Sequence, residues 1–187
     1  MKERIRLLSE NMYARPEYER RLLIQNLPER ADRENVVVII DYYVPRTRLR
    51  LRRMEFRRDG TMEFKLGLKF ADPALPAGCV ALTNLYLTEY EYEWLRPYAG
   101  TNSVIKHRYP YVYNGRRYGI DVFKTHLNGL VLAETEFDNA RDFIDFQLPA
   151  FAIEDVTTDP FFTGGSLATV TETILGRVLT ERLPGNA

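Results

Sequence analysis

The feature that most constrains this chain is a series of short segments in which charged and apolar residues alternate one by one. The clearest is the run Arg-Leu-Arg-Leu-Arg over residues 48–52, and a second, Glu-Phe-Lys-Leu-Gly-Leu-Lys-Phe, covers residues 63–70. Alternation with a period of two places successive side chains on opposite faces of a β-strand, whereas a helix would mix them. The chain is therefore expected to consist mainly of strands that have one charged face and one apolar face.

Turn signals separate these segments and predict which strands are neighbours. Arg-Arg-Asp-Gly at 57–60 predicts a hairpin of strands 47–56 and 61–70, and Asn114-Gly115 joins a strand at 104–113 to one at 118–124. Three further strands are expected at residues 17–23, 36–44 and 130–137. The interpretation is one β-rich α+β domain over 1–187, with a helical extension at 1–15, a short helix at 140–146 and a C-terminal helix at 166–182 capped by Ser166.

Composition excludes several classes of function. Lys plus Arg and Asp plus Glu both number 26, so the formal net charge of zero argues against binding to a nucleic-acid polymer. No apolar run is long enough for a signal peptide or a membrane span, so a cytoplasmic protein without a membrane partner is expected, as a monomer or homodimer. A single cysteine, Cys79, excludes an intramolecular disulfide and a cysteine-rich zinc site.

The charges on the strand faces are sorted by sign. A polar face opposite an apolar one is normal for a solvated sheet, but such a face usually mixes positive and negative side chains. Here the pairs that share a face are Arg50 with Arg52, Lys65 with Lys69, Lys106 with Arg108, and the acidic Glu134 with Glu136; Glu17, Glu19 and Arg21 share another face. Basic faces attract a polyanion and a Glu-x-Glu face attracts a hard cation, which together indicate a phosphate chain and a divalent metal. Such side chains stay charged only in a hydrated interior, and a closed barrel with a wet bore provides one.

One segment, residues 88–98, allows two interpretations. Its Glu-Tyr alternation is typical of a strand, but Thr88 followed by Glu91 forms a capping box that predicts a helix. We favour the helix, which places Glu89, Glu91 and Glu93 outside any barrel interior and leaves Trp94 in the core. The strand interpretation would place these three carboxylates inside instead.

Several charged motifs occur in an order that resembles a known family. The similar segments are Glu17-Tyr-Glu19-Arg-Arg21, the Arg50 and Arg52 pair, Lys69, Lys106-His-Arg108-Tyr109, Asp121-Val-Phe123, Glu134-Thr-Glu136 and Glu154-Asp-Val-Thr157. Over about residues 17–168 the chain resembles the CYTH, or triphosphate tunnel metalloenzyme, family. The resemblance implies a closed antiparallel β-barrel tunnel with peripheral helices.

The resemblance also implies an activity, which is metal-dependent hydrolysis of inorganic tripolyphosphate or of a small organic triphosphate. Substrate binding is expected from Arg21, Arg50, Arg52, Lys65, Lys69, Lys106 and Arg108, and the catalytic residues are expected to be Lys106, Arg108 and Asp121. Mg²⁺ or Mn²⁺ would be held by Glu17, Glu19, Glu134 and Glu136 and would activate the attacking water. A catalytically degenerate tunnel that binds polyphosphate or nucleotide, and an adenylate cyclase of the same family, are the alternatives.

The chain departs from the family in its middle. Family members carry an Arg-x-Glu-x-Glu strand before the helix that precedes the Lys-x-Arg strand. If residues 88–98 are helical, that strand corresponds to Val80-Ala-Leu82-Thr, and its acidic residues are missing. This departure motivates the alternative of binding without turnover.

Overall fold

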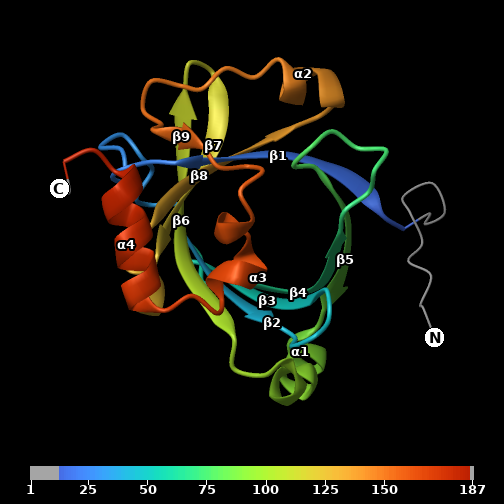
Figure 1. Ribbon diagram of the computed structural model, residues 1–187. Helices are drawn as coiled ribbons and strands as arrows, with labels where there is room; N and C mark the ends of the chain where they lie inside the picture. The colour runs from blue at the N-terminus through green and yellow to red at the C-terminus, as the bar shows by residue number, and fades with distance from the viewer. Residues whose placement is uncertain (1–12, 186–187) are drawn as a thin grey trace.

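The alternating segments form one antiparallel sheet that closes on itself in the computed structural model, which describes residues 13–185 (Figure 1). Around the barrel the strands follow the order β5-β4-β3-β2-β6-β7-β8-β1, and β1 pairs again with β5. The expected closed antiparallel β-barrel with peripheral helices is therefore confirmed. The strands are β1 (Arg15–Leu23), β2 (Val37–Tyr43), β3 (Leu49–Phe56), β4 (Met62–Phe70), β5 (Val80–Leu87), β6 (Ser103–Tyr113), β7 (Arg116–Phe123), β8 (Val131–Phe137) and β9 (Glu154–Asp155).

Closure depends on β1, which changes partner along its length. Its first three residues pair with β5, as in Glu17 opposite Val80, and the remainder pairs with β8, as in Arg21 opposite Glu134. The short strand β9 then pairs with the end of β1 on the edge that β5 has left. The two predicted hairpins, β3–β4 and β6–β7, are both present.

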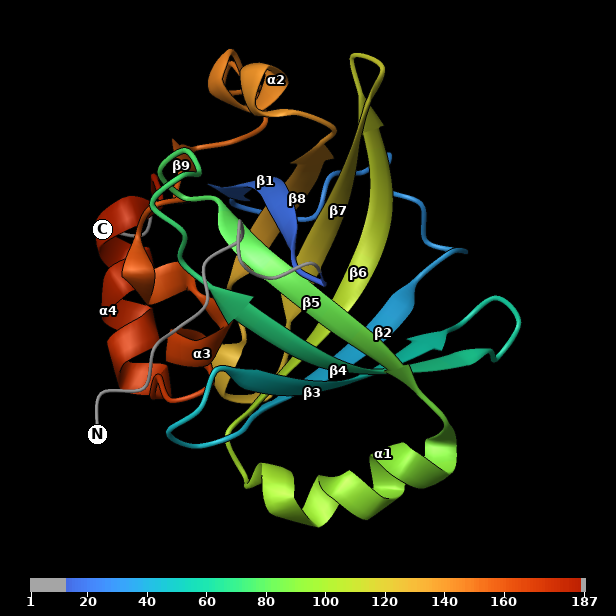
Figure 2. The same ribbon diagram turned by 90° about the vertical axis from the view of Figure 1, so that its right-hand side faces the viewer.

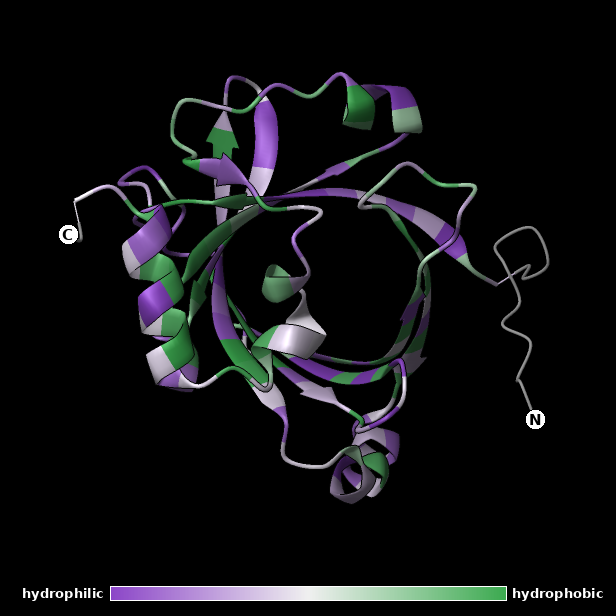
Figure 3. Ribbon diagram, viewed as in Figure 1, coloured by the Kyte–Doolittle hydropathy of each residue, from purple (hydrophilic) through white to green (hydrophobic). Residues whose placement is uncertain are grey.

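The barrel has its polar side chains inside and much of its apolar surface outside. On β3 and β4, Leu51 and Phe64 point outward and are covered by the helix α1 (Glu89–Leu95), where Tyr92 lies against Phe64 with ring centroids 4.8 Å apart. The helix α4 (Glu172–Arg182) covers a larger cluster that includes Leu127. The peripheral helices thus provide the hydrophobic burial that a polar bore cannot, and they flank the barrel in Figures 2 and 3.

The helical interpretation of the ambiguous segment is confirmed. Thr88 accepts from the backbone N–H of Glu91, and the Glu91 carboxylate accepts from that of Thr88 at 2.7 Å, which completes the capping box. A 3-10 helix, η2 (Arg96–Ala99), follows α1 directly. The expectation that Trp94 lies in the core is wrong: its side chain is 62% exposed, because Tyr92 is the helix residue that faces the barrel.

The expectation of one C-terminal helix over 166–182 is also wrong. The structure has a short helix α3 (Gly164–Leu167) capped by Thr163, and then α4 capped by Thr171, so Ser166 caps neither. The buried side of α4 carries Leu175 and Leu179. The proposed helix at 1–15 lies mostly outside the described residues, and of the rest Arg15 already belongs to β1.

Three shorter helical segments complete the fold: α2 (Ala140–Ile144), η3 (Thr125–Leu127) and η4 (Pro160–Phe162). In Figures 1 and 2, α3 lies across one end of the barrel, on the same side as α4. No helix within residues 13–185 is both long and apolar enough to cross a membrane.

Candidate functional site

The bore of the barrel is a cavity of about 660 Å³ whose walls are strongly charged. Nine basic and five acidic side chains line it, so the cavity has a positive excess although the whole chain is neutral. The basic ones are Arg15, Arg21, Arg48, Arg50, Arg52, Lys65, Lys69, Lys106 and Arg108, and the acidic ones are Glu17, Glu19, Asp41, Glu134 and Glu136. Such a cavity attracts a small polyanion by electrostatics alone.

The residues predicted to bind substrate and metal all face this one cavity. They come from β1, β3, β4, β6 and β8 and are Arg21, Arg50, Arg52, Lys65, Lys69, Lys106, Arg108, Glu17, Glu19, Glu134 and Glu136. Asp121, which was predicted to be catalytic, does not line the cavity. Its side chain is completely buried beneath Lys106 and Arg108, so it can orient these cations without touching a ligand.

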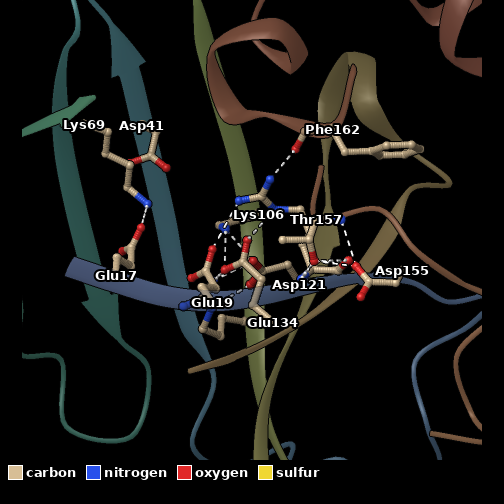
Figure 4. A network of polar contacts seen from close by, with 12 residues as sticks. Glu17, Glu19, Asp41, Lys69, Lys106, Asp121, Glu134, Asp155, Thr157 and Phe162 are labelled. Carbon is tan, nitrogen blue, oxygen red and sulfur yellow. Dashed lines mark hydrogen bonds and ion pairs between the residues drawn. The ribbon is translucent and has the colours of Figure 1, made fainter. Parts of the chain in front are cut away.

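Asp121 is the centre of a buried ion network on β6, β7 and β8 (Figure 4). The Arg108 guanidinium donates to both Asp121 carboxylate oxygens at 2.7 Å, and the Lys106 ammonium donates to Asp121 as well. Arg108 also donates to Glu134, which lies 3.7 Å from the Lys106 nitrogen. Two cations are thereby held at the cavity wall by a carboxylate behind them, as a preorganised anion site requires.

A glycine of β7, Gly119, lies beside the Arg108 side chain and makes room for this arrangement. A Cβ atom on Gly119 would lie 2.9 Å from Cδ of Arg108, closer than real Cβ contacts allow. The absence of a side chain at this position of β7 therefore permits the arginine to lie flat against the neighbouring strand.

A second ion cluster joins β2 and β3. Arg52 donates to the two oxygens of the buried Asp41 at 2.6 and 2.8 Å, and Nε of Arg50 lies 3.6 Å from the same carboxylate. Burial alone would raise the pKa of Asp41, but the charges of Arg52 and Arg50 outweigh it and hold that pKa below its usual value. Beside them, burial and the charge of Asp41 raise the pKa of Tyr43 to about 12, so the phenol stays protonated.

Arg21 connects β1 to the segment at the end of the barrel. Its guanidinium donates to Glu19 at 3.1 Å, to Glu134 at 3.3 Å and to the backbone carbonyl of Phe162 at 3.2 Å. Its backbone N–H donates to the Thr157 hydroxyl at 2.9 Å. Arg21 therefore fixes the side chains of Glu19 and Glu134, which with Glu17 form the acidic wall of the cavity, and it also holds η4 in place.

Two carboxyl groups of the acidic wall, Glu134 and Glu19, have pKa values shifted in opposite directions. Burial would raise the pKa of Glu134, but the positive charges of Lys106, Arg108 and Arg21 hold it well below its usual value. For Glu19, burial and the negative charges of Glu134 and Glu17 raise the pKa despite Lys69 and Arg21. Glu17 is paired with Lys69 from β4. Glu19 is thus a buried carboxyl that an additional cation would stabilise in its ionised form.

The carboxylates fit a divalent ion by their chemistry, although they are not gathered around a point. Within residues 13–185, no three His, Cys, Asp or Glu side chains lie close enough together to hold a metal as a group. Glu17, Glu19 and Glu134 nevertheless present hard oxygen donors to one cavity, as Mg²⁺ and Mn²⁺ require. To bind metal, Glu17 and Glu134 would have to exchange their present partners Lys69 and Arg108 for the ion.

Sequence reasoning missed some lining residues that the structure reveals. Asp41 and Tyr43 were not among the predicted site residues, although Asp41-Tyr-Tyr43-Val44 is similar to a strand of the family and Asp41 is a carboxylate within a β-branched and aromatic run. Arg48 continues the alternation of Arg50 and Arg52, so its signal was present in the sequence. Val80 and Leu82 of β5 line the cavity, whereas Glu89, Glu91 and Glu93 are exposed on α1, as the helical interpretation requires.

Comparisons with known proteins bear on the fold and the site together. No family model and no curated protein matches the sequence. The fold is similar to that of the inorganic triphosphatase NE1496, with 26% identity and a TM-score of 0.56 over 82% of this chain and 95% of that chain. A second structure of protein NE1496 matches with the same identity and TM-score over 83% and 99%. The structure of the PH1819 protein from Pyrococcus horikoshii OT3 matches with 20% identity and a TM-score of 0.47 over 68% of this chain and 83% of that chain.

Proposed function

Because the chain belongs to the CYTH, or triphosphate tunnel, family, we propose that it hydrolyses a triphosphate with the help of a divalent metal ion. The observation that carries this proposal is the cavity, where nine cations from four strands and the turn before β3 converge inside a neutral protein. A compact polyanion is the ligand that matches such a site, and its binding is supported by the likeness to an inorganic triphosphatase. Inorganic tripolyphosphate or a small organic triphosphate is the substrate class.

The cations divide into two groups that would contact the substrate from different walls. Arg50 and Arg52 come from β3, and Lys65 lies opposite Arg52 on β4, where Lys69 follows two residues after Gly67, the partner of Arg50. Lys106 and Arg108 come from β6. Phosphoryl transfer involves little covalent chemistry for a protein, so its catalysis rests on positioning and on neutralising charge on the transferred phosphate. Lys106 and Arg108 are proposed as catalytic residues because Asp121 and Glu134 hold them rigidly at the cavity wall.

The metal is proposed to lie on the acidic wall. Glu17, Glu19 and Glu134 would hold the ion. Glu136 lies directly opposite Glu19 on β8 and is more exposed, so it would be the outermost ligand. When bound, Mg²⁺ or Mn²⁺ would polarise phosphate oxygens and activate water. Transfer of Glu17 to the ion would release Lys69 for the phosphates, so that the ion and the anion would favour each other's binding.

A second candidate is a tunnel that binds polyphosphate without turnover. The observation that favours it is the apolar pair Val80 and Leu82, which occupies the cavity wall where the resemblance leads us to expect acids. The carboxylates of α1 cannot replace them, because that helix is on the outside of the barrel. Fewer oxygen ligands would weaken or remove a second metal position and slow the reaction.

The test is phosphate release from tripolyphosphate, ATP and thiamine triphosphate, each with Mg²⁺ or Mn²⁺. The proposal expects metal-dependent release from at least one of them, and at least a hundredfold loss in the double variant Lys106→Met with Arg108→Met, a magnitude of about 3 kcal/mol in activation free energy. The exposed pair Arg57 and Arg58, changed to Met, provides the control. Binding of tripolyphosphate without release would support the second candidate, and cyclic nucleotide formed from ATP would support a cyclase.

A further inference from the structure

Most cations in the cavity are already paired with a carboxylate, but Arg48 is not. Arg52, Lys69, Lys106 and Arg108 each form an ion pair of 2.8 Å or less with an acidic side chain. Arg48 lines the cavity, is exposed, and makes no ion pair with any residue in 13–185. Its positive charge is therefore available to an incoming ligand without breaking an existing contact.

Arg48 lies at one end of a row of three arginines, Arg48, Arg50 and Arg52, which we call the arginine row. Arg48, Arg50 and Arg52 all face the bore, and each step of two residues along a strand covers roughly 7 Å. Leu49 of β3 is opposite Leu68 of β4, so the next positions outward are those of Arg48 and Lys69. The guanidinium lies 5.5 Å from the centroid of the Phe70 ring, a contact that limits its freedom to move into solvent.

Arg50, in the middle of the arginine row, has a hydrogen-bond donor that no protein atom among the described residues uses. Its Nε atom is buried and has no hydrogen-bond partner among residues 13–185, and its distance of 3.6 Å to Asp41 is too long for a good hydrogen bond. A buried donor without an acceptor costs free energy that a bound anion would recover. The outer part of the row is therefore better prepared for an anion than the inner part, where Arg52 already donates to both carboxylate oxygens of Asp41.

A chain of three phosphates is about as long as one step of two residues along a strand, whereas Arg48 lies two such steps from Arg52, so phosphates bound beside Arg52 end short of Arg48. We propose that Arg48 determines specificity by binding an anionic group beyond the third phosphate. The cavity would then favour linear polyphosphates longer than tripolyphosphate, or triphosphates that carry a further anionic group. This inference rests on the proposed function, because it assumes that the deeper cations bind the first three phosphates.

The experiment compares binding of tripolyphosphate and tetrapolyphosphate by calorimetry at constant ionic strength, in metal-free buffer so that no turnover occurs. Wild-type protein, Arg48→Gln and the control Arg46→Gln are measured side by side. Arg46 belongs to the same turn and is exposed, but it does not line the cavity. The control therefore removes one positive charge close to the mouth without touching the proposed contact.

Wild-type protein should bind tetrapolyphosphate about tenfold more tightly than tripolyphosphate, the effect of one charge-assisted contact. Arg48→Gln should abolish this preference and change tripolyphosphate affinity by less than about threefold. Arg46→Gln should behave like wild type. Equal affinity of wild-type protein for the two anions, or an equal loss for both in Arg48→Gln, would overturn the inference while leaving the proposed function intact. Failure to bind either anion, with or without Mg²⁺, would instead contradict the proposed function and the inference with it.

Discussion

Asp121 lies completely buried behind Arg108, and the arginine donates to both of its carboxylate oxygens at 2.7 Å. Lys106 donates to the same carboxylate from the adjacent inward-facing position on β6. One acid thus neutralises part of two positive charges that point toward the bore. The pair explains how the barrel keeps cations in its interior without a ligand, and it makes Asp121 a positioning residue.

Replacing Asp121 with Asn should destabilise the protein by about 3–5 kcal/mol, because two cations lose their buried partner. Tripolyphosphate should then recover part of this loss, since the anion supplies the missing negative charge. We therefore expect a larger rise in melting temperature with tripolyphosphate for Asp121→Asn than for wild type. The measurement is a thermal melt over a series of ligand concentrations.

Leu51→Ala is the matched control for Asp121→Asn. Leu51 is buried on the outer face of β3, so its truncation costs a comparable about 2–5 kcal/mol without touching the bore. Its ligand-induced shift should equal that of wild type. A shift in Asp121→Asn no larger than in Leu51→Ala would show that Asp121 stabilises the fold without orienting the anion site.

The double variant Glu19→Gln with Glu134→Gln should lose Mn²⁺ binding by at least tenfold, measured by calorimetry. The reason is that Glu19 and Glu134 are the buried carboxylates on adjacent strands that repel each other, a repulsion that a divalent cation relieves. The triple variant at Glu89, Glu91 and Glu93 to Gln removes three exposed carboxylates of α1 and should leave Mn²⁺ affinity unchanged. Retained Mn²⁺ binding in the first variant, or its loss in the second, would place the metal elsewhere.

Asp41→Asn should reduce stability in a way that depends on pH. The folded-state pKa of Asp41 is held below its unfolded value by Arg52 and Arg50 against the effect of burial. Its ionised form therefore stabilises the folded state fully above an unfolded pKa of about 3.9, and this contribution disappears as pH falls through the folded pKa. Urea unfolding should show a deficit of about 3–5 kcal/mol that is constant from roughly pH 7 to 5 and shrinks only below about pH 4. A deficit that changed between pH 7 and 5 would contradict this assignment.

Gly164→Ala should destabilise the end of the barrel, whereas Gly165→Ala should not. A Cβ on Gly164 would collide with the hydroxyl and Cζ of Tyr43, while one on Gly165 would lie at an ordinary 3.8 Å from its ring. The collision requires Tyr43 or α3 to move, at a cost of about 1–3 kcal/mol. Chemical denaturation of both variants measures the difference in the free energy of unfolding. Equal stability would mean that the Tyr43 side chain moves away from the added Cβ without a measurable cost.

Much of the fold could be predicted from local patterns. The alternation over residues 48–52 and 63–70 determines which side chains share a face, and that parity placed Arg50, Arg52 and Lys69 in the bore. The turn at Asn114-Gly115 and the Thr88 capping box act within a few residues, so their effects are already present in the sequence.

Local patterns did not predict the structure correctly where several nearby residues were equally suited to the same role. Ser166, Thr163 and Thr171 are all capable of capping a helix, and only packing against the barrel determines that helices begin after the last two. Similarly, Tyr92 and Trp94 both lie on α1, and the position of Phe64 on β4 decides that Tyr92 is buried.

By itself the sequence determined most of the strands, although not β5 or β9, together with their faces, the two hairpins and the sign of each charge in the bore. Only the tertiary structure decided which charges meet: Arg21 reaches Glu134 across 113 residues of chain, and Asp121 lies behind Lys106 and Arg108 rather than among the lining residues. The physical reason is the distance along the chain over which each effect acts. Side-chain parity and capping depend on neighbours a few residues away, whereas barrel closure through the partner change of β1 brings together charges that no local pattern relates.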